Sequence, residues 1–147
     1  MSDLSELQRA LGVSFKDLSH LERALIHSSY VNENPDVAPT SNERLEFLGD
    51  AVLGLVIAEK LYLGFPQFSE GEMTRLRSAL VRRETLARLA KAINLGDFLY
   101  LGRGEEASGG RRKPGNLAGA LESVIAAIFL EQGLAGTRDF ILKLFDK

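Results

Sequence analysis

The chain has 147 residues, of which 45% are hydrophobic and 26% charged, as is typical of one soluble globular domain with a full core. It contains no cysteine, which excludes disulfide scaffolds and thiolate chemistry and suits a reducing cytoplasm. The net charge of −2 gives no overall sign of nucleic-acid binding, and the N-terminus carries acids unlike a signal peptide, so we expect a cytoplasmic protein without membrane association.

Apolar residues recur at helical spacing along the chain, and no stretch shows the alternation of a strand. Two short stripes of apolar residues at helical spacing come first, and each predicts a short helix. A proline-containing loop is predicted over residues 34–40. Thr40 with Glu43 forms a capping-box pattern, which predicts the start of a long apolar helix ending near Leu63. The stripes consist of Leu4, Leu7 and Leu11, ended by Gly12, then Leu18, Leu21, Leu25 and Ile26.

The second half of the chain is also helical. Ser69 with Glu72 is another capping box, and the helical segment that it opens is expected to break near residues 82–84. A glycine-rich, basic loop is predicted over residues 102–115, after which Asn116 is predicted to cap a second apolar helix. With a last helix over residues 136–145, the sequence predicts one all-α domain spanning residues 1–147.

The two apolar helices carry acids where a core would exclude them. In "NERLEFLGDAVLGLVIA", residues 42–58, the side chains of Glu43, Glu46 and Asp50 share one helix face, and Glu122 lies inside the second apolar helix. If these faces meet, several carboxylates converge at low dielectric, which is unfavourable unless a proton, a cationic side chain or a metal ion compensates. Oxygen ligands favour Mg²⁺ or Mn²⁺, and such sites suit phosphodiester hydrolysis.

The spacing of these acids does not by itself require a metal ion. The acids could pair with arginines elsewhere, cap neighbouring backbone or line a solvated seam. A di-iron site is excluded, because neither His20 nor His27 belongs to a Glu-x-x-His motif. For His27 and Tyr30, in "HSSY", we prefer structural roles.

The motifs, taken together, resemble one known family. "NERLEFLGDAVL" resembles the signature helix of the ribonuclease III family, "LIHSSYVNE" its preceding segment and "EGEMTRLRSALVRRETLA" its next long helix. "ASGGRRKPGNLAGALESVIAAIFLEQG" resembles the segment with its second catalytic cluster. The resemblance covers essentially the whole chain in order, and it implies an all-α endonuclease domain that forms a homodimer and cleaves double-stranded RNA with Mg²⁺, or alternatively Mn²⁺.

The resemblance also implies roles for particular residues. Three acids match the family's metal ligands, and two of these match its catalytic pair; two further acids match residues near the RNA backbone or in support of the site. An aromatic residue matches one that inserts into the partner subunit. The metal ligands are Glu46, Asp50 and Glu122, the catalytic pair Asp50 and Glu122, the supporting acids Glu43 and Glu70, and the interface residue Phe47.

One position departs from the family pattern. Where the family has Asp-x-x-Glu, this chain has Gly119-Ala120-Leu121-Glu122, so one carboxylate is missing. A water or a neighbouring group would have to complete the metal's shell, and we expect weakened activity. The alternative is a catalytically silent RNA-binding or assembly module with the same fold.

Duplex RNA presents mainly its phosphates and 2′-hydroxyls to proteins, so basic clusters are the expected contacts. Arginines and a lysine gather over residues 73–93, although an arginine on a helix is more often simply solvated. The loop residues Arg111, Arg112 and Lys113 are better candidates, because glycines let the backbone approach a ligand. The 147 residues that end at "LKLFDK" leave no room for the separate double-stranded-RNA-binding domain of bacterial relatives, whether that domain was removed or the protein works without it, so we expect this chain to bind duplex RNA more weakly and with greater salt sensitivity.

Overall fold

A computed structural model describes residues 3–38 and 40–146, and this part of the chain is helical, as predicted. Apart from helical hydrogen bonds and turns, its backbone pairing includes one isolated parallel bridge between Ile26 and Tyr100. The helices are α1 (Ser5–Leu11), α2 (Ser19–Ala24), α3 (Ser28–Glu33), α4 (Glu43–Gly64), α5 (Glu70–Leu80), α6 (Arg83–Ala92), α7 (Arg103–Ala107) and α8 (Pro114–Phe145), with 3₁₀ turns η1 (Leu95–Phe98) and η2 (Gly110–Arg112).

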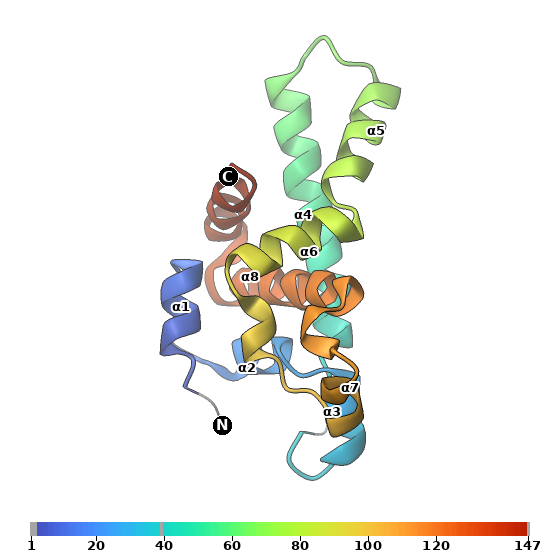
Figure 1. Cartoon of the computed structure of the whole chain (residues 1–147). Coiled ribbons are helices and arrows are strands. Elements are labelled where there is room, and N and C mark those ends of the chain that lie inside the picture. The colour runs from blue at the N-terminus through green and yellow to red at the C-terminus, as the bar shows by residue number, and fades with distance from the viewer. Residues whose placement is uncertain (1–2, 39, 147) are drawn as a thin grey trace.

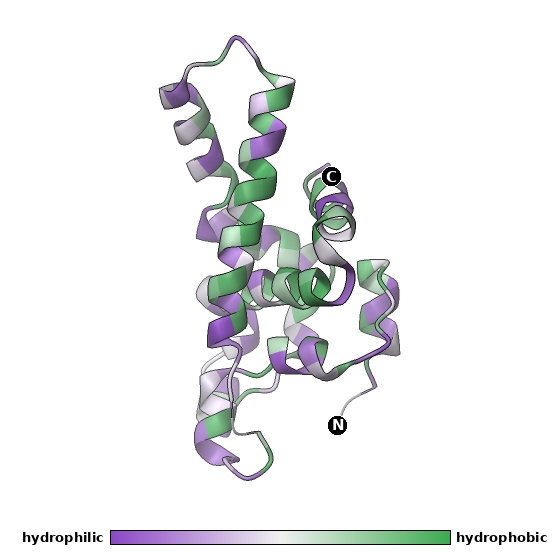
Figure 2. Cartoon of the chain, turned by 180° about the vertical axis from the view of Figure 1, so that it is seen from behind, coloured by the Kyte–Doolittle hydropathy of each residue, from purple (hydrophilic) through white to green (hydrophobic). Residues whose placement is uncertain are grey.

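The core is built on the crossing of α4 and α8. Figure 1 shows α8 running across the middle of the molecule and α4 passing it steeply, while α5 folds back along the outer half of α4. Both central helices are green along much of their length in Figure 2, where green marks hydrophobic residues. Leu53 and Val56 of α4 and Leu121, Ile125 and Ile128 of α8 are fully buried, and each such burial contributes about 1.5–3 kcal/mol.

A glycine allows the two helices to approach closely. A Cβ placed on Gly49 would lie 1.7 Å from the carbonyl oxygen of Glu122, so only glycine fits there. Beside this contact the buried hydroxyl of Ser123 donates to the carbonyl oxygens of Asn42, at 3.1 Å, and Gly119, at 2.9 Å. The start of α4 is therefore tied to the second turn of α8, with Gly49 at the crossing.

Several predicted helix boundaries are confirmed. The Ser69–Glu72 capping box is present, with both reciprocal hydrogen bonds, and the chain breaks between α5 and α6 at the predicted place. Gly12 ends α1 with a φ of 70°, and α4 ends at Gly64, one residue beyond the predicted Leu63.

Two capping predictions are wrong. The N-cap of α4 is Asn42 instead of Thr40, because Asn42 is held by hydrogen bonds from its backbone N–H to Ile26 and from its amide to Ala24. The helix therefore starts at Glu43, whose carboxylate accepts from the Ser41 hydroxyl. Asn116 does not cap α8, which begins two residues earlier at Pro114, a residue suited to a first helical position.

The predicted loop over residues 102–115 also differs from expectation, because it contains α7 and η2.

The helix α8 is long and apolar enough to cross a membrane, but most of that apolar stretch is buried inside the fold. A kink at Gly133, with a φ of 79°, divides α8 and redirects its last turns. The apolar residues of α8 therefore serve the core of this chain.

Candidate active site

The crossing of α4 and α8 brings the acids of both helices together. Asp50 lies one residue beyond Gly49, and Glu122 is the residue that Gly49 touches, so the two carboxyl groups face each other across the contact and share a hydrogen bond. Glu46 lies one turn earlier on α4, on the same side. Asp50 is exposed, whereas Glu46 and Glu122 are half-buried, which leaves the group open to solvent on one side.

The crowding of like charges is visible in the pKa values of these groups. Burial, the hydrogen bond to Asp50 and the negative charges of Asp50 and Glu46 raise the pKa of Glu122 to about 8. The pKa of Glu46 is also raised, first by burial and then by the charges of Glu43 and Asp50, while His27 acts in the opposite direction. Without a bound cation, the surroundings therefore disfavour the charged forms of Glu46 and Glu122.

The donor chemistry fits a hard divalent cation. The three acids offer only oxygen ligands, they lie together at a partly buried crossing, and a bound cation would relieve their mutual repulsion. Across the described residues, however, no three acidic or histidine side chains already converge closely enough to hold an ion. The side chains of Glu46, Asp50 or Glu122 would have to turn on binding, which rotation about their own bonds allows.

A hydrogen-bond network next to the acids was not predicted from the sequence. The Nδ1 of His27 accepts from the backbone N–H of Ser29 at 3.0 Å, so its Nε2 carries the proton and donates to Oδ1 of Asn116 at 3.0 Å. The Asn116 amide then donates to Glu105 at 2.9 Å and to the Gly110 carbonyl at 3.0 Å. This network joins α3, α7 and η2 to the first turn of α8, one turn before Gly119.

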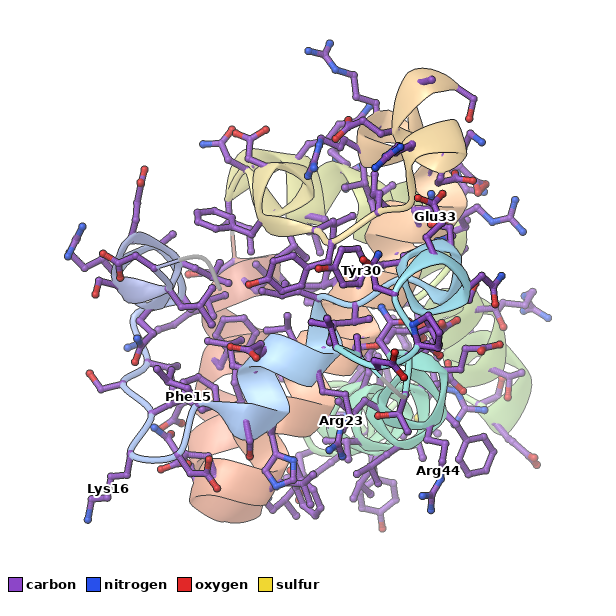
Figure 3. The ribbon with its side chains drawn as sticks, turned by 90° about the horizontal axis from the view of Figure 1, so that it is seen from below. Phe15, Lys16, Arg23, Tyr30, Glu33 and Arg44 are labelled. Atoms are coloured by element: carbon purple, nitrogen blue, oxygen red, sulfur yellow. The ribbon has the colours of Figure 1, made fainter. Side chains whose placement is uncertain are left out.

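The network explains the structural role that we prefer for the "HSSY" segment. Tyr30 packs its ring against Tyr100, with centroids 5.5 Å apart, and the carboxylate of Glu33 accepts from the backbone N–H of Arg103 at 2.8 Å. Figure 3 shows Tyr30 and Glu33 on α3, beside the segment that contains α7. No pattern in the sequence indicates these contacts, because their partners are about 70 residues apart.

The supporting acids lie in different places. Glu43 is exposed in the first turn of α4, close enough for its charge to act on Glu46. Glu70 lines a shallow hollow with Ala58 and Tyr62, near the C-terminal end of α4. Residues 58–62 follow Asp50 by 8 to 12 positions, or about 12–18 Å along the helix, so Glu70 does not join the acids within this chain.

The predicted loop cations are largely engaged within the chain. Arg111 pairs with Glu106 at 2.6 Å and donates to the carbonyl oxygens of Gly96 and Leu99, which gives it a structural role. Lys113 pairs with Glu105 at 2.9 Å, and this contact, with the hydrogen bond from Asn116, lowers the pKa of Glu105. The side chain of Arg112 is exposed and makes no hydrogen bond or ion pair with residues 3–38 or 40–146. The exposed cations of the α5–α6 segment are Arg75, Arg77, Arg82, Arg83, Arg88 and Lys91.

Phe47 projects from α4 with 81% of its surface exposed, an unusual position for a phenylalanine. It borders an open hollow of about 790 Å³ that is also lined by His20, Leu48 and Leu130. Figure 3 shows Arg23 of α2 and Arg44 of α4, two further residues lining this hollow, on the face seen from below.

Comparison with known proteins identifies the family. The profile of the ribonuclease-III-like family matches residues 17–147. The chain belongs to that family. It is 61% identical over 145 residues to the protein named Ribonuclease 3 of Dehalococcoides mccartyi, covering 99% of this chain and 61% of the relative. It is 55% identical over 141 residues to Ribonuclease 3 of Heliobacterium modesticaldum, covering 96% of this chain and 60% of the relative.

Two of the solved structures that resemble this chain illustrate the shared fold. The nuclease domain of ribonuclease III from Campylobacter jejuni superimposes with a TM-score of 0.91 at 41% identity, covering 98% of this chain and 96% of that one. Dicer from Pichia stipitis matches with a TM-score of 0.64 at 28% identity, over 89% of this chain and 55% of that one. This ribonuclease-III-like chain spans about three fifths of the length of the curated relatives, and its match to the C. jejuni protein is to a nuclease domain.

Proposed function

We propose that this chain is the nuclease domain of an endoribonuclease that hydrolyses phosphodiester bonds of double-stranded RNA with a divalent metal ion. The observation that carries the proposal is the hydrogen-bonded pair of Asp50 and Glu122, brought together from two crossing core helices with Glu46 one turn away. The raised pKa values of Glu46 and Glu122 mean that burial and crowding disfavour their charged forms, which lowers the stability of the fold. A reactive site therefore explains their placement better than a stabilising role does.

Hydrolysis adds water to the phosphorus and breaks its bond to the 3′-oxygen, which leaves a 5′-phosphate and a 3′-hydroxyl. Glu46, Asp50 and Glu122 are the residues that would hold Mg²⁺ or Mn²⁺, which supplies activation of water and charge stabilisation. Asp50, as the exposed member, is placed to meet substrate first. Glu122 exchanges its proton near neutral pH when no cation is bound, because its pKa is about 8.

A homodimer is the second part of the proposal. The C. jejuni nuclease domain is described as flexible in a region involved in dimer formation, and the present chain exposes Phe47 next to a hollow large enough for an aromatic side chain. In a two-fold symmetric pair, Phe47 of each protomer would enter the hollow of the other. Such a pair presents two sites, one for each strand of a duplex.

The exposed cations of α5 and α6, together with Arg112, are the proposed phosphate contacts. The ion pairs of Arg111 with Glu106 and of Lys113 with Glu105 hold the segment between α7 and α8 in place. In this proposal these two residues therefore contribute to RNA binding only indirectly. We place the reaction in the cytoplasm, in keeping with the cysteine-free composition.

The direct test is to incubate the chain with a labelled RNA duplex and Mg²⁺ or Mn²⁺. We expect short products with 5′-phosphate ends, and none from Asp50→Asn or Glu122→Gln. Glu72→Gln is a matched control, because Glu72 is an exposed acid whose side chain caps α5. Absence of cleavage at enzyme excess with both metals would refute the enzymatic proposal.

Gly119 favours a second candidate, a module that binds duplex RNA without cutting it, because α8 offers no carboxylate at that position. Under this alternative, RNA binding is salt-dependent and unchanged in Asp50→Ala, and no metal produces turnover. The enzyme instead loses turnover in Asp50→Ala while keeping its affinity for RNA.

A further inference from the structure

The hollow beside Phe47 carries positive charge that its own chain leaves unpaired. Arg23 in the last turn of α2 and Arg44 in the first turn of α4 both line it, and both side chains are exposed. Figure 3 shows the two arginines on neighbouring helices, on the face of the molecule seen from below. Neither forms an ion pair or a side-chain hydrogen bond with residues 3–38 or 40–146. Two guanidinium groups at one hollow therefore remain available to a second molecule.

An acid and a histidine also line this hollow. Glu43 is next to Arg44 in the chain without pairing with it, and its exposed carboxylate accepts from the Ser41 hydroxyl at 2.9 Å. The Nδ1 of His20 is buried and has no hydrogen-bond partner among the described residues. Buried polar atoms in folded proteins nearly always have a partner, so this nitrogen fits a surface that another chain covers.

We propose that Arg23 and Arg44 pair with Glu43 of the partner subunit, so that the hollow selects a second copy of this chain by charge as well as by shape. The proposal rests on the proposed homodimer and names the polar contacts that select the partner. A two-fold interface joins one patch to itself, so a patch with both signs of charge is complementary when each acid faces the bases of the other chain. Glu43 and Phe47 lie one turn apart on α4, so a Phe47 side chain that enters the partner's hollow carries Glu43 toward the arginines there.

An RNA phosphate is the other ligand that two arginines suit, but the rest of the hollow favours a protein. Phe47 and Leu130 line it with 81% and 46% of their surfaces exposed, and a hydrated phosphate gains nothing from such apolar surface. Glu43, in the same hollow, repels a phosphate. The surface therefore fits a partner with an apolar side chain and an acid beside it, which is what this chain itself presents.

The test exchanges charges between two chains. One variant, Glu43→Arg, carries only basic residues at the three positions, and the other, Arg23→Glu/Arg44→Glu, carries only acidic ones. Each variant alone meets like charge across the interface, so we expect its dimer dissociation constant to rise about tenfold or more in sedimentation velocity. An equimolar mixture restores opposite charges at every pair. It should form a mixed dimer, identified by native mass spectrometry, within about threefold of the parent's affinity.

Arg9→Glu is the matched control. Arg9 is an exposed arginine in the last turn of α1, as Arg23 is in α2, but it lines a different hollow, so its reversal should leave the dimer unchanged. Raising NaCl from about 0.1 M to about 1 M should weaken the parent dimer by about threefold or more, because salt screens exposed ion pairs. A dimer held by Phe47 alone would not weaken in this way.

The fold of each variant is checked by circular dichroism. A mixed dimer forms only from folded chains, so its appearance also excludes misfolding as the cause of the losses. If a charge-reversed chain does not fold, the neutral variant Arg23→Gln/Arg44→Gln replaces it and should weaken the dimer by about threefold or more.

Reversed variants that dimerise like the parent, or a mixture that dimerises no better than either variant alone, would overturn the proposal. If the parent dimerises but is insensitive to these charges, the inference fails and the proposed homodimer stands. If the arginine variants lose RNA binding while dimerising normally, the hollow binds phosphate instead and the inference fails. A parent that stays monomeric at tens of micromolar overturns both the inference and the homodimer, whereas the separate cleavage assay with duplex RNA still decides the proposed enzymatic function.

Discussion

Replacement of Gly49 by alanine should damage both the fold and the site. The new Cβ would lie 1.7 Å from the backbone oxygen of Glu122, whereas ordinary van der Waals contact starts at 3.4 Å, so α4 and α8 must separate locally. Overpacking costs about 1–3 kcal/mol, and the upper end applies because the obstacle is backbone. Alanine also favours the helix over glycine by about 1 kcal/mol, which leaves a net loss of about 2 kcal/mol.

Gly54→Ala provides the control within the same helix. A Cβ at Gly54 meets nothing within 4 Å, so only the helix preference operates and the variant should be more stable by up to about 1 kcal/mol. Urea unfolding followed by circular dichroism, at one fixed protein concentration because of the proposed dimer, should separate the two variants by about 3 kcal/mol. Equal unfolding midpoints would show that the close approach at Gly49 does not determine how the two helices pack.

Three further predictions concern the dimer, the network and the acids. Phe47→Ala should shift the proposed dimer toward monomer at micromolar concentration in sedimentation velocity, because it removes the aromatic side chain that would fill the partner's hollow. Asn116→Ala should lower the free energy of unfolding by about 1–3 kcal/mol, because His27 and Glu105 lose their shared partner; urea titration measures this. Without divalent cations, stability should fall as pH rises from 4.5 to about 8, since the folded state keeps the Glu122 proton over that range and the unfolded state does not. We expect a fall of roughly 2 kcal/mol, discounted for the partial exposure of this group, and Glu122→Gln should flatten the pH dependence in denaturant titrations.

The sequence predicted the fold through features that act locally. The spacing of Leu4, Leu7 and Leu11 and the Ser69–Glu72 capping box depend on neighbours within a few residues, and both are confirmed. The start of α4 was misplaced because tertiary hydrogen bonds from Asn42 to Ala24 and Ile26 outweigh the local pattern of Thr40 and Glu43.

The site was predictable only in outline. Glu46 and Asp50, one turn apart in an apolar helix, indicate a role other than core packing. The sequence does not show, however, that the close approach at Gly49 brings Glu122 against them. The engagement of Arg111 by Glu106 and two backbone carbonyls was likewise hidden, because a basic residue in a glycine-rich loop has the same sequence whether it binds phosphate or its own chain. The placement of Phe47 as an interface residue stays a prediction.

The same small residues that make the core compact also create the charged site. Gly49 lets two apolar helices pack closely enough to bury leucine, isoleucine and valine side chains at the crossing, which supplies stability. That approach also forces Asp50 and Glu122 together and raises the pKa of Glu122, which opposes stability above pH 4.5. Mutations that relieve the repulsion should therefore stabilise the fold while removing the cation site, whereas mutations that separate the helices should weaken both. A stabilising effect of Glu122→Gln, together with a destabilising effect of Gly49→Ala, would be the pattern expected of a site maintained for chemistry rather than for folding.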